Sequence, residues 1–145
     1  MNNCTISSYM ADFIYKEIIL KYENDIKKNP KGYNFNLKRF KFFLAKSKIT
    51  ISFTTILDIS NIDTKSQLDN YFYCYQHSKF NQVVSLLTHI RNSFAHGRFS
   101  QDKTYFYLED YKNSKTCTMK ARIKKNLLKK IHTRINNVNQ INLIT

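Results

Sequence analysis

The stretch FNQVVSLLTHIRNSFAHG, residues 80–97, carries the clearest periodic pattern in the chain. Its large apolar side chains recur at intervals of three and four residues, which places them on one face of a helix. These are Phe80, Val83, Leu87, Ile90 and Phe94. Ser78 can cap such a helix at its start, and Gly97 can end it in a left-handed backbone conformation. The pattern predicts an amphipathic helix with one buried stripe.

Similar apolar repeats predict four further helical regions. They cover residues 7–28, the surroundings of 37–44, residues 63–77 and a final helix from about Lys120 to Val138. The apolar positions that define them are Met10, Ile14, Ile18, Tyr22 and Ile26; Leu37, Phe40 and Leu44; Leu68, Phe72 and Tyr75; and Ile123, Leu127, Ile131 and Ile135. Most of the chain is therefore expected to be helical.

Two segments favour extended structure. Residues 104–110 and 115–119 are β-prone runs joined by a polar connection, which predicts a hairpin. Residues 49–57 alternate apolar and hydroxyl side chains, and they fit either a strand or a helix extension. Because two Gly and one Pro are too few for a fold with many tight turns, a β-sandwich or barrel is disfavoured. We expect an all-α helical bundle with a small β-hairpin between the helix over residues 80–96 and the C-terminal helix.

The length and the cysteines bound the remaining possibilities. A chain of 145 residues fits a single domain, 1–145. Its N-terminus does not resemble a signal peptide and no apolar run reaches the roughly 18 residues of a membrane span, so we expect a cytoplasmic protein without a membrane partner. Cys4, Cys74 and Cys117 are odd in number and widely spaced. They predict reduced thiols, with no disulfide framework, metal site or cofactor.

The formal net charge of +14 would attract a polyanion such as RNA. The predicted final helix and the end of the preceding helix supply the candidate RNA-binding residues Arg98, Lys124, Lys125 and Lys129. An AT-rich coding sequence would also produce many lysines without any selection for nucleic-acid binding. A basic interaction protein with a solvated charged face therefore remains an alternative.

Three side chains near the end of the helix over residues 80–96 suggest chemistry. Arg91 and His96 lie off the apolar stripe, and Asn92 and His96 are four residues apart, so they are neighbours on one face. Arg91 can hold a phosphate and stabilise the added charge of a pentacoordinate phosphorane. His96, in the last turn, can transfer protons. These are the requirements of RNA cleavage without a metal.

Residues 89–97, HIRNSFAHG, resemble the signature of the HEPN superfamily, in which Arg is followed by His after four to six residues. The resemblance implies an all-α bundle that forms a homodimer with a composite RNA-cleaving cleft. In it the RNA 2′-hydroxyl attacks its own phosphodiester and leaves a 2′,3′-cyclic phosphate. Arg91 would bind the phosphate and His96 would transfer protons. Asn92 would orient either Arg91 or His96. The predicted hairpin also resembles a plasmid-borne branch of small HEPN proteins.

A toxin or phage-defence role, with a protein antitoxin as a further partner, is what this resemblance implies. In HEPN toxins paired with a nucleotidyltransferase antitoxin, a Tyr that is modified lies two residues after the His, where this chain has Arg98. That mode of control is therefore in doubt. Two alternatives stay open. The chain could be a non-catalytic HEPN-fold module that binds RNA or nucleotides, or Arg91 and His96 could be a surface arginine and a helix-capping histidine.

Overall fold

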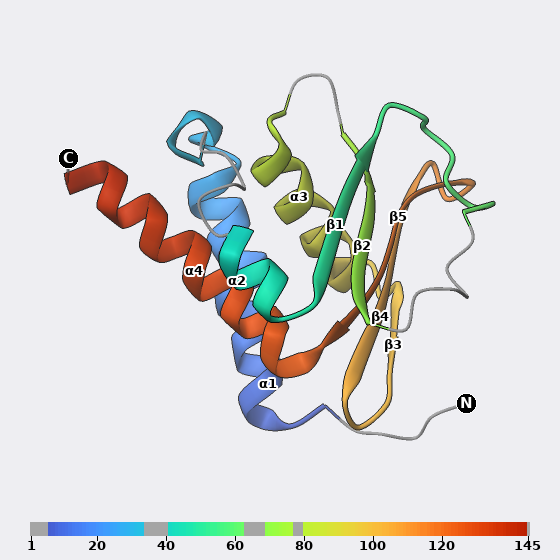
Figure 1. Ribbon diagram of the computed structural model, residues 1–145, viewed down its shortest axis with the longest axis horizontal. Helices are drawn as coiled ribbons and strands as arrows, with labels where there is room; N and C mark the ends of the chain where they lie inside the picture. Colours follow the sequence, from blue (N-terminus) through green and yellow to red (C-terminus); the bar gives the residue numbers. More distant parts are fainter. Residues whose placement is uncertain (1–5, 34–40, 63–68, 77–79, 145) are drawn as a thin grey trace.

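A five-stranded mixed sheet forms the centre of the protein (Figure 1), in the order β1-β2-β5-β4-β3. The computed structural model describes residues 6–33, 41–62, 69–76 and 80–144. β1 and β2 are parallel, and the other neighbours are antiparallel. The strands are β1 (Ile49–Thr54), β2 (Asn70–Tyr75), β3 (Phe99–Gln101), β4 (Tyr105–Lys112) and β5 (Thr116–Lys124). The fold is therefore α/β, and the prediction of an all-α bundle is wrong.

The helices of the two termini and the helix over the motif lie on the same side of this sheet (Figure 1). The N-terminal helix starts as α1 and continues with wider, π-type hydrogen bonding as η1 and η2. A short 3₁₀ turn, η3, follows it. The bounds are α1 (Ser8–Phe13), η1 (Ile14–Leu20), η2 (Tyr22–Ile26), η3 (Pro30–Tyr33), α2 (Lys41–Lys46), α3 (Gln82–Ala95) and α4 (Lys125–Ile144). α3 packs between the sheet and the N-terminal helix.

The predicted helix over the motif is confirmed as α3. Val83, Ile90 and Phe94 of its apolar stripe are buried in one core cluster with side chains of β4 and β5. The N-cap is Asn81, whose Oδ1 accepts a hydrogen bond from Val84 N at 2.9 Å, whereas the expected cap Ser78 lies outside the described residues. Gly97 has φ +66°, which a residue with a Cβ rarely adopts, and it ends the helix as predicted.

The helix predicted over residues 63–77 is wrong where the structure describes it, because 70–75 form strand β2. Residues 63–68 and 77 lie outside the described part. β2 is a central strand between β1 and β5. Both of its faces are largely covered, with Tyr71, Phe72 and Cys74 all buried. A strand buried on both faces does not alternate in hydropathy, so Phe72 and Tyr75 fitted a helical spacing by coincidence.

In the C-terminal half the predicted hairpin and the predicted final helix are both present, but their boundaries differ from the prediction. The expected hairpin is present as β4 and β5. β5 continues to Lys124, so the last helix begins at Lys125 and not near Lys120. Ala121 and Ile123 are alternate, inward-facing positions of the strand, and Ile123 was misassigned to the helix. Residues 49–54 form strand β1, and α2 matches the end of the helix expected around Leu37–Leu44, of which Leu37 and Phe40 are not described. None of the described helices has the length and hydropathy to cross a membrane.

Candidate functional site

The end of α3 presents His96 to solvent. His96 is the C-cap residue of the helix, and its backbone N–H donates to the Asn92 carbonyl at 3.0 Å. Its side chain is exposed. Within the described ranges no residue forms a hydrogen bond or an ion pair with the imidazole. Both ring nitrogens of His96 are therefore accessible to a substrate.

Arg91 points from α3 toward the N-terminal helix. Its Nη1 donates to Asn92 Oδ1 at 2.8 Å, its Nη2 forms an ion pair with Glu23 Oε1, and its guanidinium lies 5.6 Å from the centre of the Tyr22 ring. About a quarter of the side chain, 23%, is exposed. The guanidinium is thus held in place by neighbours from two elements, and one of them is a carboxylate that a phosphate could replace.

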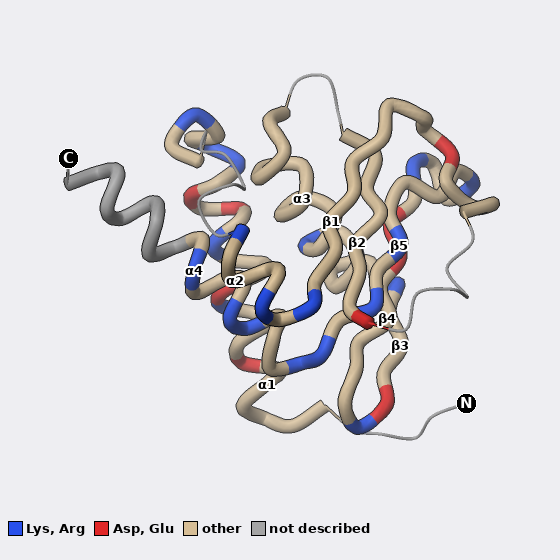
Figure 2. Tube along the Cα trace, viewed as in Figure 1, with Lys and Arg blue, Asp and Glu red and all other residues tan. Residues whose placement is uncertain are grey.

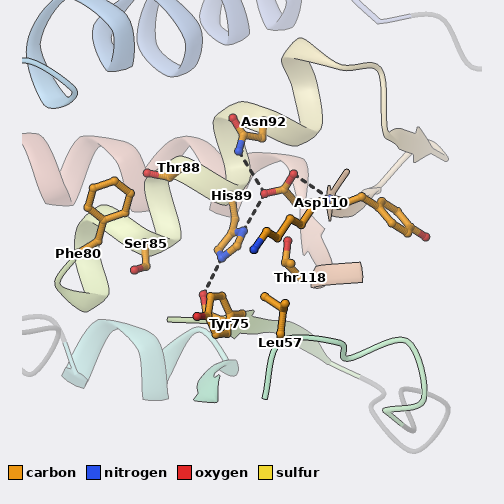
Figure 3. A pocket seen from close by; sticks show the side chains of 11 residues that line it. Leu57, Tyr75, Phe80, Ser85, Thr88, His89, Asn92, Asp110 and Thr118 are labelled. Carbon is orange, nitrogen blue, oxygen red and sulfur yellow. Dashed lines mark hydrogen bonds and ion pairs between the residues drawn. The ribbon is translucent and has the colours of Figure 1, made fainter. Parts of the chain in front are cut away.

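Asn92 connects Arg91 to strand β4. Its Nδ2 donates to Asp110 Oδ2 at 3.2 Å (Figure 3). Because a carboxylate only accepts and a guanidinium only donates, these two contacts define the amide orientation, with Nδ2 toward Asp110 and Oδ1 toward Arg91. Asp110 is 4% exposed. It acts as a positioning residue that holds the Asn92 amide against Arg91.

His89 lies seven residues before His96 on the same face of α3, and its environment is the opposite of that of His96. It is buried, with Nδ1 2.8 Å from Asp110 Oδ2 and Nε2 2.7 Å from the Tyr75 carbonyl oxygen (Figure 3). Both nitrogens of the His89 ring therefore lie within hydrogen-bond distance of an oxygen atom of the protein. His89 has no nitrogen left for a substrate.

Sequence reasoning missed Asp110 and its contacts. The partner of His89 lies 21 residues away, on strand β4. The side chains that meet at this site are therefore Glu23, Arg91, Asn92, Asp110 and His89, from three separate elements. No pattern in the sequence links these elements.

The candidate RNA-binding residues do not share one helix face. Arg98 stacks on the Tyr111 ring at 4.6 Å, just after the helix end. Lys124 is exposed at the end of β5, whereas Lys125 donates to Gln101 Oε1 at 2.6 Å. Lys129 donates to Tyr9 Oη and lies 3.8 Å from the centre of its ring. The lysines lie at the junction of β5 and α4, where Figure 2 shows a run of basic residues.

The cysteines and acidic residues suggest no further chemistry. Among the residues that the structure describes, no group of three His, Cys, Asp or Glu side chains could hold a metal ion. Burial raises the pKa of the Cys74 thiol, and burial also raises that of Cys117. Both are free cysteines in the core, and a thiol that resists deprotonation is a poor nucleophile.

Comparison with known proteins gives one match. The family model described as HEPN pEK499 p136 matches residues 4–141, which include α3 and all five strands. Neither the curated proteins nor the solved structures gave a significant match. The match covers nearly the whole chain, and the motif over residues 89–97 lies inside it. The chain therefore belongs to the HEPN superfamily, in the family described as HEPN pEK499 p136.

Proposed function

We propose that the protein is a metal-independent endoribonuclease whose centre consists of Arg91, Asn92 and His96 at a homodimer interface. One observation carries this proposal: an exposed imidazole, with no partner among the described residues, lies one helical turn from an asparagine that is hydrogen-bonded to an arginine. Domains of the superfamily are often ribonucleases, and they commonly bind RNA and dimerise. The three residues supply phosphate binding and proton transfer without an acidic metal cage.

In the proposed reaction the RNA 2′-oxygen attacks the adjacent phosphorus. The O2′–P bond forms, the P–O5′ bond breaks, and the products are a 2′,3′-cyclic phosphate and a 5′-hydroxyl. One proton leaves the 2′-hydroxyl and one is given to the 5′-oxygen, so two proton transfers are needed. Arg91 stabilises the negative charge that develops on the phosphorane, and Asn92 keeps the guanidinium in place.

The need for two proton transfers favours a dimer. Of the two histidines of the motif over residues 89–97, His89 has both nitrogens bonded within the protein, so the motif of one protomer offers His96 alone. A second His96, from a second protomer, would complete the pair of acid and base. The two helix ends that carry His96 would then face each other across the interface.

RNA would be attracted by the positive field of the chain, with Arg98, Lys124, Lys125 and Lys129 as the proposed backbone contacts. Lys124 is the best placed of these lysines, because it is exposed and its neighbours Lys125 and Lys129 already contact Gln101 and Tyr9. We propose a cytoplasmic toxin or defence protein, restrained by a protein antitoxin.

A specific observation favours a second candidate function, a HEPN-fold module that binds RNA or nucleotides without cleaving them. Arg91 is already paired with Glu23, so a phosphate must displace a carboxylate before Arg91 can stabilise it. If that displacement does not occur, His96 lacks its electrostatic partner. The two functions differ in turnover and not in binding.

Cleavage assays in the presence of EDTA separate them. Wild-type protein is expected to cut RNA and to leave DNA of the same sequence intact, because DNA lacks the attacking hydroxyl. Arg91→Ala should remove most cleavage, whereas Lys103→Ala, an exposed charge loss in the turn before β4, should not. Light scattering should show twice the chain mass. RNA binding without cleavage under these conditions would favour the binding module.

A further inference from the structure

A cavity of about 330 Å³ lies beside Asn92, next to the proposed cleavage centre. It opens between α3, the end of β2 and the β4–β5 hairpin (Figure 3). Leu57, Tyr75 and Phe80 supply its apolar walls. Its volume is at the lower end of the range of about 300 to 1,000 Å³ that is usual for small-molecule pockets. None of the roles assigned above uses this space.

The buried charged groups of the cavity, His89 and Asp110, are already satisfied by the protein. His89 is bonded at both nitrogens, and Asp110 accepts from His89 and Asn92 through Oδ2 and from the Tyr111 N–H through Oδ1. A simple anion or cation would therefore find no free counter-charge in the interior. The ligand must bond to neutral groups.

Ser85 is such a group. Its side chain lines the cavity and is 1% exposed, and its Oγ finds no hydrogen-bond partner among the described residues. A buried hydroxyl without a partner costs free energy, which a ligand that bonds to it would recover. Thr118 adds a second hydroxyl to the lining. Apolar walls combined with hydroxyls that both donate and accept fit a flat heteroaromatic ring.

The cavity and the cleavage centre lie along one face of α3. Ser85, His89, Asn92 and His96 follow one another at intervals of four, three and four residues, which keeps them on one line of the helix. Eleven residues span about 16 Å along the axis. Asn92 lines the cavity and also bonds to Arg91. A strand whose phosphate lies near Arg91 and His96 would therefore pass the cavity with a neighbouring base.

We infer that the cavity is a nucleobase pocket, which holds the base of a nucleotide beside the scissile phosphate and so selects the cleavage site. The position relative to the cut rests on the proposed ribonuclease function, whereas binding of a free nucleotide does not. Lys112 lines the same cavity and is exposed, so its ammonium can meet the phosphate of the bound nucleotide.

Calorimetric titration of the full chain with the four nucleoside 5′-monophosphates tests the pocket, with ribose 5-phosphate as the control that lacks a base. At least one nucleotide is expected to bind, and ribose 5-phosphate should bind at least about tenfold more weakly because the base supplies the contacts. Ser85→Leu should fill the cavity and abolish binding. The milder Ser85→Ala should weaken it about three- to tenfold through the lost hydrogen bond.

Ser93→Ala is the matched control, because Ser93 is a buried serine of the same helix whose hydroxyl donates to the His89 carbonyl and does not line the cavity. It should leave nucleotide binding unchanged. Equal binding of ribose 5-phosphate, or unchanged binding in both Ser85 variants, would overturn the pocket.

The outcome also separates this inference from the ribonuclease proposal. If wild-type protein cuts RNA and Ser85→Leu keeps the same base preference at the cut, the pocket fails and the ribonuclease stands. If nucleotides bind in a Ser85-dependent way and no RNA is cut, the pocket stands and the ribonuclease fails.

Discussion

Two histidines on one face of α3, seven residues apart, have opposite surroundings. His89 is 7% exposed and is bonded to Asp110 and to the Tyr75 carbonyl. His96 lies at the helix end, exposed, and no described residue bonds to its ring. Thus His89 links α3 to the sheet, whereas His96, on the same face of the same helix, is exposed to solvent.

Position along a helix therefore does not by itself define the role of a histidine, because the partners that other elements supply decide it. β4 passes beside His89 and supplies Asp110, whereas the chain turns away at Gly97 just beyond His96. We therefore propose that His89 stabilises the fold and positions its neighbours, and that His96 transfers protons. Substitution of each histidine tests this division.

His96→Ala should lower RNA turnover by on the order of 10² to 10⁴-fold, because it removes an acid-base group. The free energy of unfolding should change by less than about 0.5 kcal/mol, since the side chain is exposed. Steady-state cleavage rates and urea denaturation measure the two effects. Ser100→Ala, an exposed change in β3, is the control. Full activity in a well-folded His96→Ala protein would end the assignment.

His89→Ala should show the reverse pattern. It leaves the buried Asp110 carboxylate without its hydrogen bond to His89, and a buried charged group that loses a hydrogen-bond partner costs about 3 kcal/mol. Urea denaturation should show this loss, and His89→Gln, which keeps a hydrogen-bonding side chain, should lose less. A His89→Ala protein that unfolds at the same urea concentration as wild type would show that the pair is not structural.

His132 is a third histidine, buried like His89 but with no carboxylate partner among the residues that the structure describes. Its Nδ1 bonds to the Leu128 carbonyl, and it packs edge-on against Phe13. Burial, with a smaller contribution from nearby Lys21, lowers the pKa of His132 to about 4, against the opposing hydrogen bond to the Leu128 carbonyl. The unfolded chain therefore takes up a proton near pH 6.5, before the folded chain does.

Stability should accordingly fall as the pH is lowered from about 6.5 to about 4, by roughly 3 kcal/mol in total. Above that window the His132 contribution should be constant. Urea denaturation at a series of pH values measures the slope, and His132→Leu should flatten it. An equal slope in His132→Leu would assign the acid sensitivity to other groups.

Glu23→Gln should have the smallest effect, a gain in RNA affinity of about two- to fivefold. It removes the carboxylate that pairs with Arg91, and a partly exposed ion pair contributes up to about 1 kcal/mol. Fluorescence anisotropy with labelled RNA in a His96→Ala background measures the affinity without cleavage. Asp12→Asn removes the same charge from the same helix at a site that pairs with Lys16. If both variants gained the same RNA affinity, the effect would come from the change in net charge and not from the release of Arg91.

The sequence predicted α3 well because its signals are local. Val83, Leu87 and Ile90 define its apolar face within two helical turns, and Gly97 marks its end. Both signals can be recognised from a short window of sequence. The same local reasoning brought Arg91, Asn92 and His96 to one helix end. It also led to the superfamily, which the match over residues 4–141 supports.

The sheet could not be predicted in the same way, because its pairings are not local. The sequence of residues 71–75 alone fits a helix, and only the pairing with β1 and β5 identifies this segment as a strand. The contacts of the site residues are also made between segments that are far apart in the sequence. Glu23 and Asp110 reach α3 only after the N-terminal helix and β4 have packed against it, so their contacts with Arg91 and His89 were invisible in the sequence.

In the proposed reaction the RNA's own 2′-hydroxyl is the nucleophile and no metal takes part. The most direct test is mass-spectrometric analysis of the products that wild-type protein forms in EDTA from an RNA with a mapped cleavage site, next to the same RNA with a single 2′-deoxy nucleotide at that site. We predict a 2′,3′-cyclic phosphate and a 5′-hydroxyl from the first RNA, and no cut at the substituted position of the second. Cleavage at the 2′-deoxy position, or a linear phosphate that forms only when Mg²⁺ is restored, would contradict the account.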